Sequence, residues 1–229
     1  MILEQNLKKV LEKINTAKNN STWGQRVELV AATKTRDIST IEKLYRLGVK
    51  TIGENKVQEA EGKFLDFPGF ENIKKRFIGH LQSNKVNKCL KLFDSIDSID
   101  SLRIAKKLNK ALLQQNTKKL ECLIEINTSK EPQKHGFQPH VSDEIISCFE
   151  LGCLNIVGLM TVGPNTKNKS TKQNAFILLR NLKNQINNEL GLQAITELSM
   201  GMTNDYELAI QEGSTMVRVG TGLFGTRNY

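Results

Sequence analysis

The chain has 229 residues, of which 38% are hydrophobic and 25% charged, as is ordinary for a globular protein with a sizeable core. No apolar run approaches the ~18 residues needed to span a bilayer, so no membrane segment is predicted. The four cysteines form no C-x-x-C pair and only three histidines accompany them, so we predict packing cysteines and no metal site.

The formal net charge of +9 raises the question of nucleic-acid binding. The lysines, however, are spread along several helical patterns, whose spacing would scatter them over different outer faces. No recognition helix, zinc knuckle or aromatic-rich RNA-binding strand accompanies them. We therefore predict a solvated basic surface and no nucleic-acid partner, and keep a basic nucleic-acid-binding protein as the remote alternative.

The N-terminus begins with an amphipathic helix. Leu3, Leu7, Val10, Leu11 and Ile14 recur at helical spacing with charged residues between them. A signal peptide would need an uninterrupted apolar core in its place, so a cytoplasmic location is expected.

Short β-branched runs then alternate with longer helical patterns. Helices are predicted, among others, at 38–48, at 101–116, and at 171–190, the last closed by Gly191. The predicted strands are 28–33, 50–54, 76–80, 93–97, 121–127, 155–160, 196–200 and 216–220. Strands separated by helices form parallel sheets, because parallel neighbours need crossover connections.

Eight βα units after an extra N-terminal helix predict an α/β protein with a single (β/α)₈ barrel, residues 1–229 forming one domain. The alternative is a doubly wound open sheet. That fold favours a glycine-rich turn after the first strand, and the sequence AATKTRD has no glycine there.

In such a barrel, functional residues lie where strands end and βα loops begin. Polar or glycine residues follow the predicted strands repeatedly, and we expect them to share one rim. They are Lys34, Glu54 with Asn55, His80 with Gln82, Asn127, Ser199 with Gly201, and Gly220 with Thr221.

The last two loops are candidates for a phosphate site. Ser199 and Gly201 follow the predicted seventh strand, and Gly220 and Thr221 follow the eighth. Barrels often bind phosphate there through backbone amides, since glycine permits close approach and hydroxyls add donors. A plain turn is the alternative for each motif taken singly.

Lys34 ends the apolar run LVAATKT, beside the proposed phosphate site if the barrel closes. A strand-end lysine commonly extends into solvent. Partial desolvation in an apolar barrel mouth would instead favour the neutral, nucleophilic amine. An amine beside a phosphate-holding loop is what pyridoxal 5′-phosphate (PLP) requires, a Schiff base to lysine and an anchor for its phosphate.

Arg218 shares a strand face with Gly220 in the run MVRVG, because side chains alternate. It could pair with a carboxylate at the barrel bottom. If it faces the cofactor, it would donate to the pyridine nitrogen and keep it unprotonated, which makes the ring a poorer electron sink.

These motifs resemble those of the pyridoxal phosphate homeostasis protein family, also called proline synthetase co-transcribed homologues. The resemblance covers nearly the whole chain. It rests on LVAATKT, TIGENKVQEA, FIGHLQSNK, SIDS, GLMTVGP, LSMGMTND and GSTMVRVGTGLFG, in the family's order.

The resemblance implies a PLP barrel of fold type III, like the N-terminal domain of alanine racemase, acting in PLP homeostasis and delivery without efficient turnover. Carried over by position, Lys34 would hold PLP as a Schiff base and Asn55 would lie beside the ring. Ser199 and the Gly220–Thr221 backbone would bind the phosphate, and Arg218 would meet the pyridine nitrogen. The expected partners are PLP and apo PLP-dependent enzymes, with the chain a monomer.

The family usually has Trp-His where this chain has Lys75 and Arg76, which leaves any role of that pair open. A PLP-dependent amino-acid racemase of low activity is the main alternative. Racemisation needs an acid–base group on each face of the cofactor, and the tyrosines Tyr45, Tyr206 and Tyr229 offer no obvious second group. We therefore predict no catalytic residues.

Overall fold

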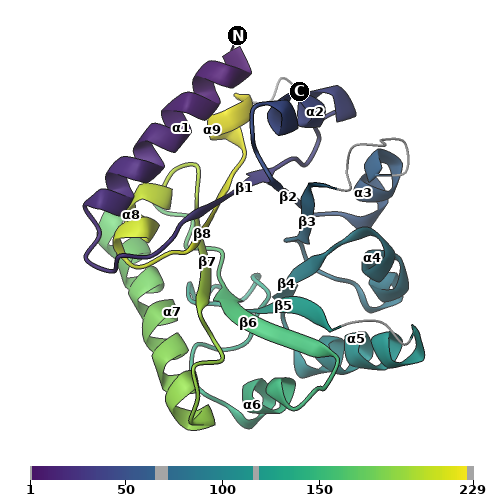
Figure 1. The fold of residues 1–229 in the computed structure, drawn as a ribbon. Coiled ribbons are helices and arrows are strands. Elements are labelled where there is room, and N and C mark those ends of the chain that lie inside the picture. The colour runs from purple at the N-terminus through teal and green to yellow at the C-terminus, as the bar shows by residue number, and fades with distance from the viewer. Residues whose placement is uncertain (1, 65–71, 116–118, 226–229) are drawn as a thin grey trace.

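The computed structural model describes residues 2–64, 72–115 and 119–225, and shows eight strands surrounded by helices (Figure 1). Among the helices in these ranges, none is both long and apolar enough to cross a membrane. The strands are β1 (Glu28–Ala32), β2 (Thr51–Glu54), β3 (Lys74–Phe77), β4 (Ser95–Ile99), β5 (Leu120–Glu125), β6 (Leu154–Met160), β7 (Glu197–Met202) and β8 (Met216–Val219). The helices are α1 (Ile2–Asn19), α2 (Ile38–Arg46), α3 (Val57–Phe64), α4 (Val86–Leu92), α5 (Leu102–Gln115), α6 (Asp143–Phe149), α7 (Lys169–Leu190), α8 (Tyr206–Gln211) and α9 (Thr221–Phe224), with a 3₁₀ turn, η2 (Ser83–Lys85), before α4.

The sheet is a closed barrel. Each strand pairs in parallel with the next, and β8 pairs with β1, where Val30 lies opposite Arg218. The predicted barrel is therefore confirmed, and the open sheet kept as its alternative is excluded. Gly191 ends α7 in the left-handed region at φ 65°, as its position in the sequence predicted.

Several strand limits differ from the predictions, and two of the differences matter for function. β3 ends at Phe77, so His80 lies in a loop beyond the strand and not within it. β7 continues through an irregular register to Met202, so Gly201 lies within the strand and not after it, and Ser199, inside the predicted bounds 196–200, lies three residues before its end. Apolar runs do not mark where a ladder ends, because pairing continues through polar residues and glycine when the neighbouring strand offers partners.

Helix α1 packs beside α8 and α9, as Figure 1 shows. Its apolar face buries Leu7, Val10 and Ile14. Along this helix, Asn6 Nδ2 donates to the backbone oxygen of Leu223 at 3.0 Å, and Lys13 pairs with Glu207 at 2.8 Å. The extra helix thus braces the segment around β8.

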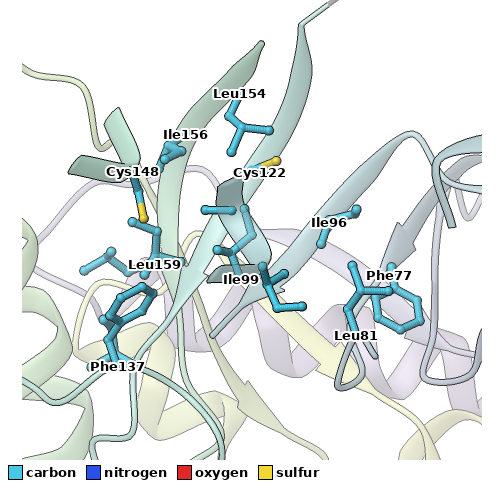
Figure 2. Close-up of a cluster of buried hydrophobic side chains, with 14 of the residues drawn as sticks. Phe77, Leu81, Ile96, Ile99, Cys122, Phe137, Cys148, Leu154, Ile156 and Leu159 are labelled. Carbon is cyan, nitrogen blue, oxygen red and sulfur yellow. The ribbon is translucent and has the colours of Figure 1, made fainter. Parts of the chain in front are cut away.

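The main core lies between the barrel and its helices. Figure 2 shows part of it, where Ile96 and Ile99 of β4 pack near Cys122 of β5 and Leu159 of β6. Cys89, Cys122 and Cys148 are buried among the described residues, in accord with the predicted packing role, and Cys153 is half-buried at the cluster's edge. A smaller apolar layer of Val30, Leu123, Met160 and Met216 forms a separate cluster on the barrel strands.

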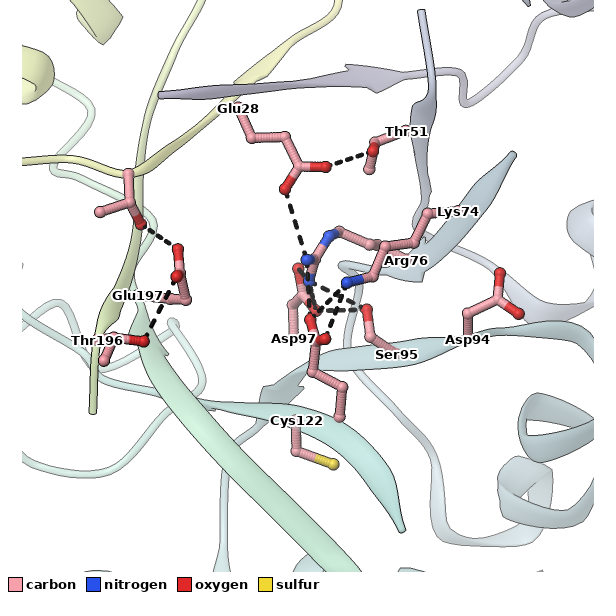
Figure 3. A network of polar contacts seen from close by, with 12 residues as sticks. Glu28, Thr51, Lys74, Arg76, Asp94, Ser95, Asp97, Cys122, Thr196 and Glu197 are labelled. Carbon is pink, nitrogen blue, oxygen red and sulfur yellow. Dashed lines mark hydrogen bonds and ion pairs between the residues drawn. The ribbon is translucent and has the colours of Figure 1, made fainter. Parts of the chain in front are cut away.

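A charged network crosses the barrel near the start of the strands (Figure 3). Arg76, 2% exposed, lies 3.0 Å from Asp97 and 2.9 Å from Glu121, and Glu28 lies 3.6 Å away. Burial alone would lower the pKa of Arg76, but these carboxylates outweigh it and raise the pKa. Lys75 lies within β3, and its backbone amide donates to Asp94 Oδ2 at 2.7 Å. Arg76 therefore neutralises buried acids in the barrel.

Candidate functional site

A cavity of about 390 Å³ opens at the rim formed by the carboxyl ends of the strands, a size usual for small-molecule sites. It brings together five of the seven predicted site residues: Lys34, Asn55, Arg218, Gly220 and Thr221. These residues come from the loops or ends of β1, β2 and β8. Barrel closure makes β1 and β8 neighbours, which is why positions so far apart in sequence share one cavity.

Lys34 follows the buried Thr33 at the end of β1 and is itself exposed at the cavity. The desolvation expected for this lysine in an apolar barrel mouth is therefore not seen in the structure. Thr35, the next residue, has φ 64°, a left-handed conformation that is uncommon for a residue other than glycine. The backbone amide of Thr35 donates to Glu59 Oε1, which holds the turn on α3.

Three lysines of the described ranges line the cavity, and two of them are engaged. Lys134 Nζ lies 2.7 Å from Glu131 and donates to the Gly163 carbonyl at 2.9 Å. Lys172 lies 3.5 Å from Asp205. Lys34 makes no hydrogen bond or ion pair with any residue that the structure describes. It is therefore the cavity amine that can react without breaking an existing contact.

Arg218 lines the cavity from β8 and is 5% exposed. One guanidinium nitrogen donates to both the backbone oxygen and Oγ of Ser199, at 2.8 and 2.7 Å, and the other donates to the Thr161 carbonyl at 2.7 Å. Burial lowers the pKa of Arg218 from its usual value. Three neutral acceptors thus fix the orientation of this side chain without neutralising its charge.

Ser199 and Gly201 do not line the cavity. Ser199 is fully buried on β7, and its hydroxyl accepts from Arg218. Gly201 has φ 93°, and a Cβ there would lie 2.6 Å from the Ala209 Cβ and 2.8 Å from the Tyr206 Cα. The glycine therefore lets β7 approach α8, and both residues support the site from beneath it.

Thr203 lines the cavity where Ser199 was expected. Its Oγ1 accepts a hydrogen bond from the Gly222 amide at 3.2 Å, which joins the loop after β7 to the first turn of α9. Next to it, Gly220 and Thr221 contribute backbone at the start of α9, where the first amides lack intrahelical partners. The run MTND, which follows the predicted seventh strand, is the sequence signal that could have identified it.

Asn55 lines the cavity from the loop after β2. Its backbone is approached so closely by Gly79 that a Cβ at position 79 would lie 2.1 Å from the Asn55 carbonyl oxygen. The loop after β3 thus fixes the backbone of Asn55. The side-chain amide of Asn55 makes no hydrogen bond within the described residues.

Sequence reasoning did not assign Arg36, Lys134, Lys172 or Thr203 to the site. Arg36 stacks on Phe224, with 5.0 Å between its guanidinium carbon and the ring centre. Among the described residues that line the cavity, five are basic and only Asp205 is acidic. An excess of positive charge with backbone amides and a hydroxyl favours an anionic ligand, and an unengaged amine suits an aldehyde. The donor set therefore fits a phosphorylated aldehyde such as PLP.

A closed barrel of eight parallel strands, with a ligand cavity at the carboxyl ends of the strands, defines the class of TIM-barrel proteins. A family model described as alanine racemase, N-terminal domain, matches residues 5–228. The chain belongs to the pyridoxal phosphate homeostasis protein family. It is 40% identical to the pyridoxal phosphate homeostasis protein of Haemophilus influenzae, with 100% of this chain and 98% of that protein covered. It is 35% identical to the pyridoxal phosphate homeostasis protein of Aquifex aeolicus, with 98% of each chain covered.

A solved structure supports the same relationship. PipY of Synechococcus elongatus PCC7942, determined with PLP bound, superimposes with a TM-score of 0.84 at 29% sequence identity. The match covers 97% of this chain and 100% of PipY.

Proposed function

We propose that this chain binds PLP in the rim cavity, holds it as a Schiff base on Lys34, and serves PLP homeostasis by storing and delivering the cofactor. The observation that carries the proposal is the free state of Lys34. Among the cavity lysines, Lys134 and Lys172 are engaged by acidic groups, whereas Lys34 meets no partner in the described chain. Condensation of the Lys34 amine with the aldehyde forms a C=N bond and releases one water.

The remaining cavity residues have distinct roles in this proposal. The Gly220 and Thr221 backbone and the Thr203 hydroxyl bind the phosphate, and Lys172 adds positive charge nearby. Arg218 donates to the pyridine nitrogen, and Asn55 lies beside the ring. Ser199 acts indirectly, because its hydroxyl and carbonyl orient Arg218.

PLP supplies an electron sink to reactions at amino-acid carbons, and this site would use it weakly. A positively charged arginine at the ring nitrogen disfavours protonation there, and so limits carbanion stabilisation. Racemisation also needs a second acid–base group opposite Lys34. No tyrosine of the described residues lines the cavity. Tyr206 instead lies in the core beside α1 and is 4% exposed. These features support a carrier over a racemase.

The Schiff base is tested by loading the purified protein with PLP, reducing it with borohydride and mapping the modified peptide by mass spectrometry. We expect one modified residue, Lys34, and loss of both the visible absorption and the trapped adduct in Lys34→Ala. Lys134→Ala is the matched control from the same cavity and should keep the Lys34 adduct. Trapping on another lysine in the wild-type protein would refute the assignment.

Delivery is tested by mixing the loaded protein with an apo PLP-dependent enzyme and following recovery of that enzyme's activity. We expect faster recovery than with the same concentration of free PLP in the presence of a PLP scavenger. Borohydride-reduced protein, whose cofactor cannot leave, is the control. Equal recovery with reduced and unreduced protein would argue against delivery, and turnover of an amino acid by the loaded protein would favour a racemase.

The proposal includes a monomer acting in the cytoplasm. Sedimentation of the PLP-loaded protein at several concentrations tests the first point, and fractionation of the source cells tests the second.

A further inference from the structure

Three side chains from successive loops meet on the rim outside the Lys34 cavity. His80 follows β3, Asp100 follows β4, and His135 lies in the loop after β5. His80 Nδ1 is 2.8 Å from Asp100 Oδ2, and His135 Nδ1 is 4.0 Å from the same oxygen. One ligand atom from each residue lies within 4.8 Å of the other two.

The two imidazoles lie face to face. Their ring centres are 3.7 Å apart and their planes differ by 11°. The His80 and His135 side chains are 39% and 54% exposed, whereas the Asp100 side chain is 8% exposed. A buried carboxylate therefore lies beneath two accessible imidazoles, so that an ion from solvent can reach all three groups.

Supporting contacts orient the Asp100 carboxylate and fix the backbone beside each histidine. Ser101 Oγ donates to Asp100 Oδ1 at 3.0 Å, which leaves Oδ2 directed to the histidines. Each histidine is also next in sequence to a glycine, Gly79 or Gly136, that packs closely against backbone atoms elsewhere in the chain. A Cβ at Gly79 would lie 2.1 Å from the Asn55 oxygen, and one at Gly136 would lie 2.9 Å from the Asn127 nitrogen. Oriented ligands on fixed backbone are typical of metal sites.

We propose that His80, Asp100 and His135 bind a divalent transition-metal ion, with zinc the best match to this ligand set. Two imidazoles and one carboxylate are ligands that zinc accepts, at about 2.0–2.2 Å from the ion. Ligand atoms around such an ion lie roughly 3–3.5 Å apart. Because the two ring planes are nearly parallel, binding one ion requires the exposed His135 imidazole to turn out of the stack, which also closes its 4.0 Å separation from Asp100. Three protein ligands leave a position open to water or to another ligand.

This site is distinct from the proposed Schiff-base lysine. Lys34 comes from the loop after β1, whereas the three ligands come from the loops after β3, β4 and β5. The two regions adjoin through Lys134, the neighbour of His135, which lines the Lys34 cavity. An ion here would place a Lewis acid beside that cavity without occupying it.

The experiment uses full-length protein without a histidine tag, stripped with a chelator and then titrated with zinc chloride by calorimetry. Cobalt(II) absorption gives a second readout of imidazole ligation. We expect one equivalent of zinc to bind, with affinity reduced by about tenfold or more in His80→Gln and in His135→Gln. His140→Gln is the matched control, because His140 is an exposed histidine of the same loop that lies outside the cluster, and its affinity should be unchanged.

Two results would overturn the proposal. One is the absence of stoichiometric zinc binding by the wild-type protein. The other is an equal loss of affinity in His140→Gln, which would indicate binding by surface histidines in general. The conclusion rests on the His135 variant, because this exposed side chain can be replaced without disturbing the core, whereas the Asp100 side chain is only 8% exposed. Borohydride trapping at Lys34 in the same variants separates failure of the metal site from failure of PLP binding.

Discussion

Lys63 Nζ lies 2.8 Å from Glu54 Oε1 in a buried ion pair that contacts the residue preceding Lys34. The same ammonium donates to the Thr33 carbonyl at 2.9 Å and lies 2.7 Å from Glu59, which accepts from the Thr35 amide. Burial raises the pKa of Glu54 even though Lys63 opposes that effect. This one ammonium thus links β2 and α3 to the residues on both sides of Lys34.

Replacing Lys63 with alanine should lower the free energy of unfolding by about 3–5 kcal/mol, because it leaves the Glu54 carboxylate buried without a cation. It should also slow PLP trapping at Lys34, since the Thr33 carbonyl and Glu59 lose their shared donor. Urea unfolding and the rate of borohydride-trapped adduct measure the two effects. Lys88→Ala is the control, because Lys88 pairs with Glu61 on the surface, and its loss should cost less than about 1 kcal/mol. Equal effects of the two substitutions would contradict the assigned role.

Arg76→Met should destabilise the barrel by a similar amount, about 3–5 kcal/mol. Methionine fills much of the volume but leaves the fully buried Asp97 without its ion pair. The measurement is chemical denaturation followed by circular dichroism. Arg46→Met, in which a largely exposed arginine is replaced, should change stability by less than about 0.5 kcal/mol. A stable Arg76→Met protein would mean that Asp97 is neutral in the fold.

Gly79→Ala should prevent stable folding or shift the loop that carries Asn55. The added Cβ would lie 2.1 Å from the Asn55 carbonyl oxygen, and backbone cannot rotate away as a side chain can. Gly62→Ala makes the same chemical change within α3, where nothing lies within 4 Å of the new methyl group. It should stabilise the protein by up to about 1 kcal/mol, because alanine favours a helix more than glycine does. The melting temperatures of the two variants, each compared with that of wild type, measure these opposite effects on stability.

Glu125→Gln should change how stability depends on pH. Burial, with a smaller contribution from Asp100, raises the pKa of Glu125 from 4.5 to about 7. The folded state therefore binds this proton more tightly than the unfolded state. The associated stability is present below pH 4.5 and is lost as the pH rises through about 7.

The Glu125→Gln variant should consequently gain stability relative to wild type between pH 5 and pH 9, by an amount on the order of 3 kcal/mol. Denaturant unfolding of both proteins at each pH, with a chelator present, measures the difference, because other titrating groups cancel in the comparison. A difference that is the same at both pH values would show that Glu125 titrates normally.

The sequence by itself determined the architecture. Eight alternating strand and helix patterns required a parallel sheet, and the barrel followed, with Lys34 at the end of β1 and Gly191 at the end of α7. These features depend on local periodicity and on backbone conformations that only certain residues favour, so they can be predicted without knowing any long-range contact. The membership of Lys34, Arg218 and Gly220 in one cavity also followed, because barrel closure makes β1 and β8 neighbours.

Only the tertiary structure decided how deep each side chain lies and which partner it meets. Ser199 could not be placed below the cavity from sequence, because the extension of β7 to Met202 depends on its pairing with β8. The engagement of Lys134 and Lys172, and the freedom of Lys34 within the described chain, are set by acids on other loops. The meeting of His80, Asp100 and His135 likewise requires three strands to end at one level. Such contacts join residues far apart in sequence, and no local pattern encodes the register that brings them together.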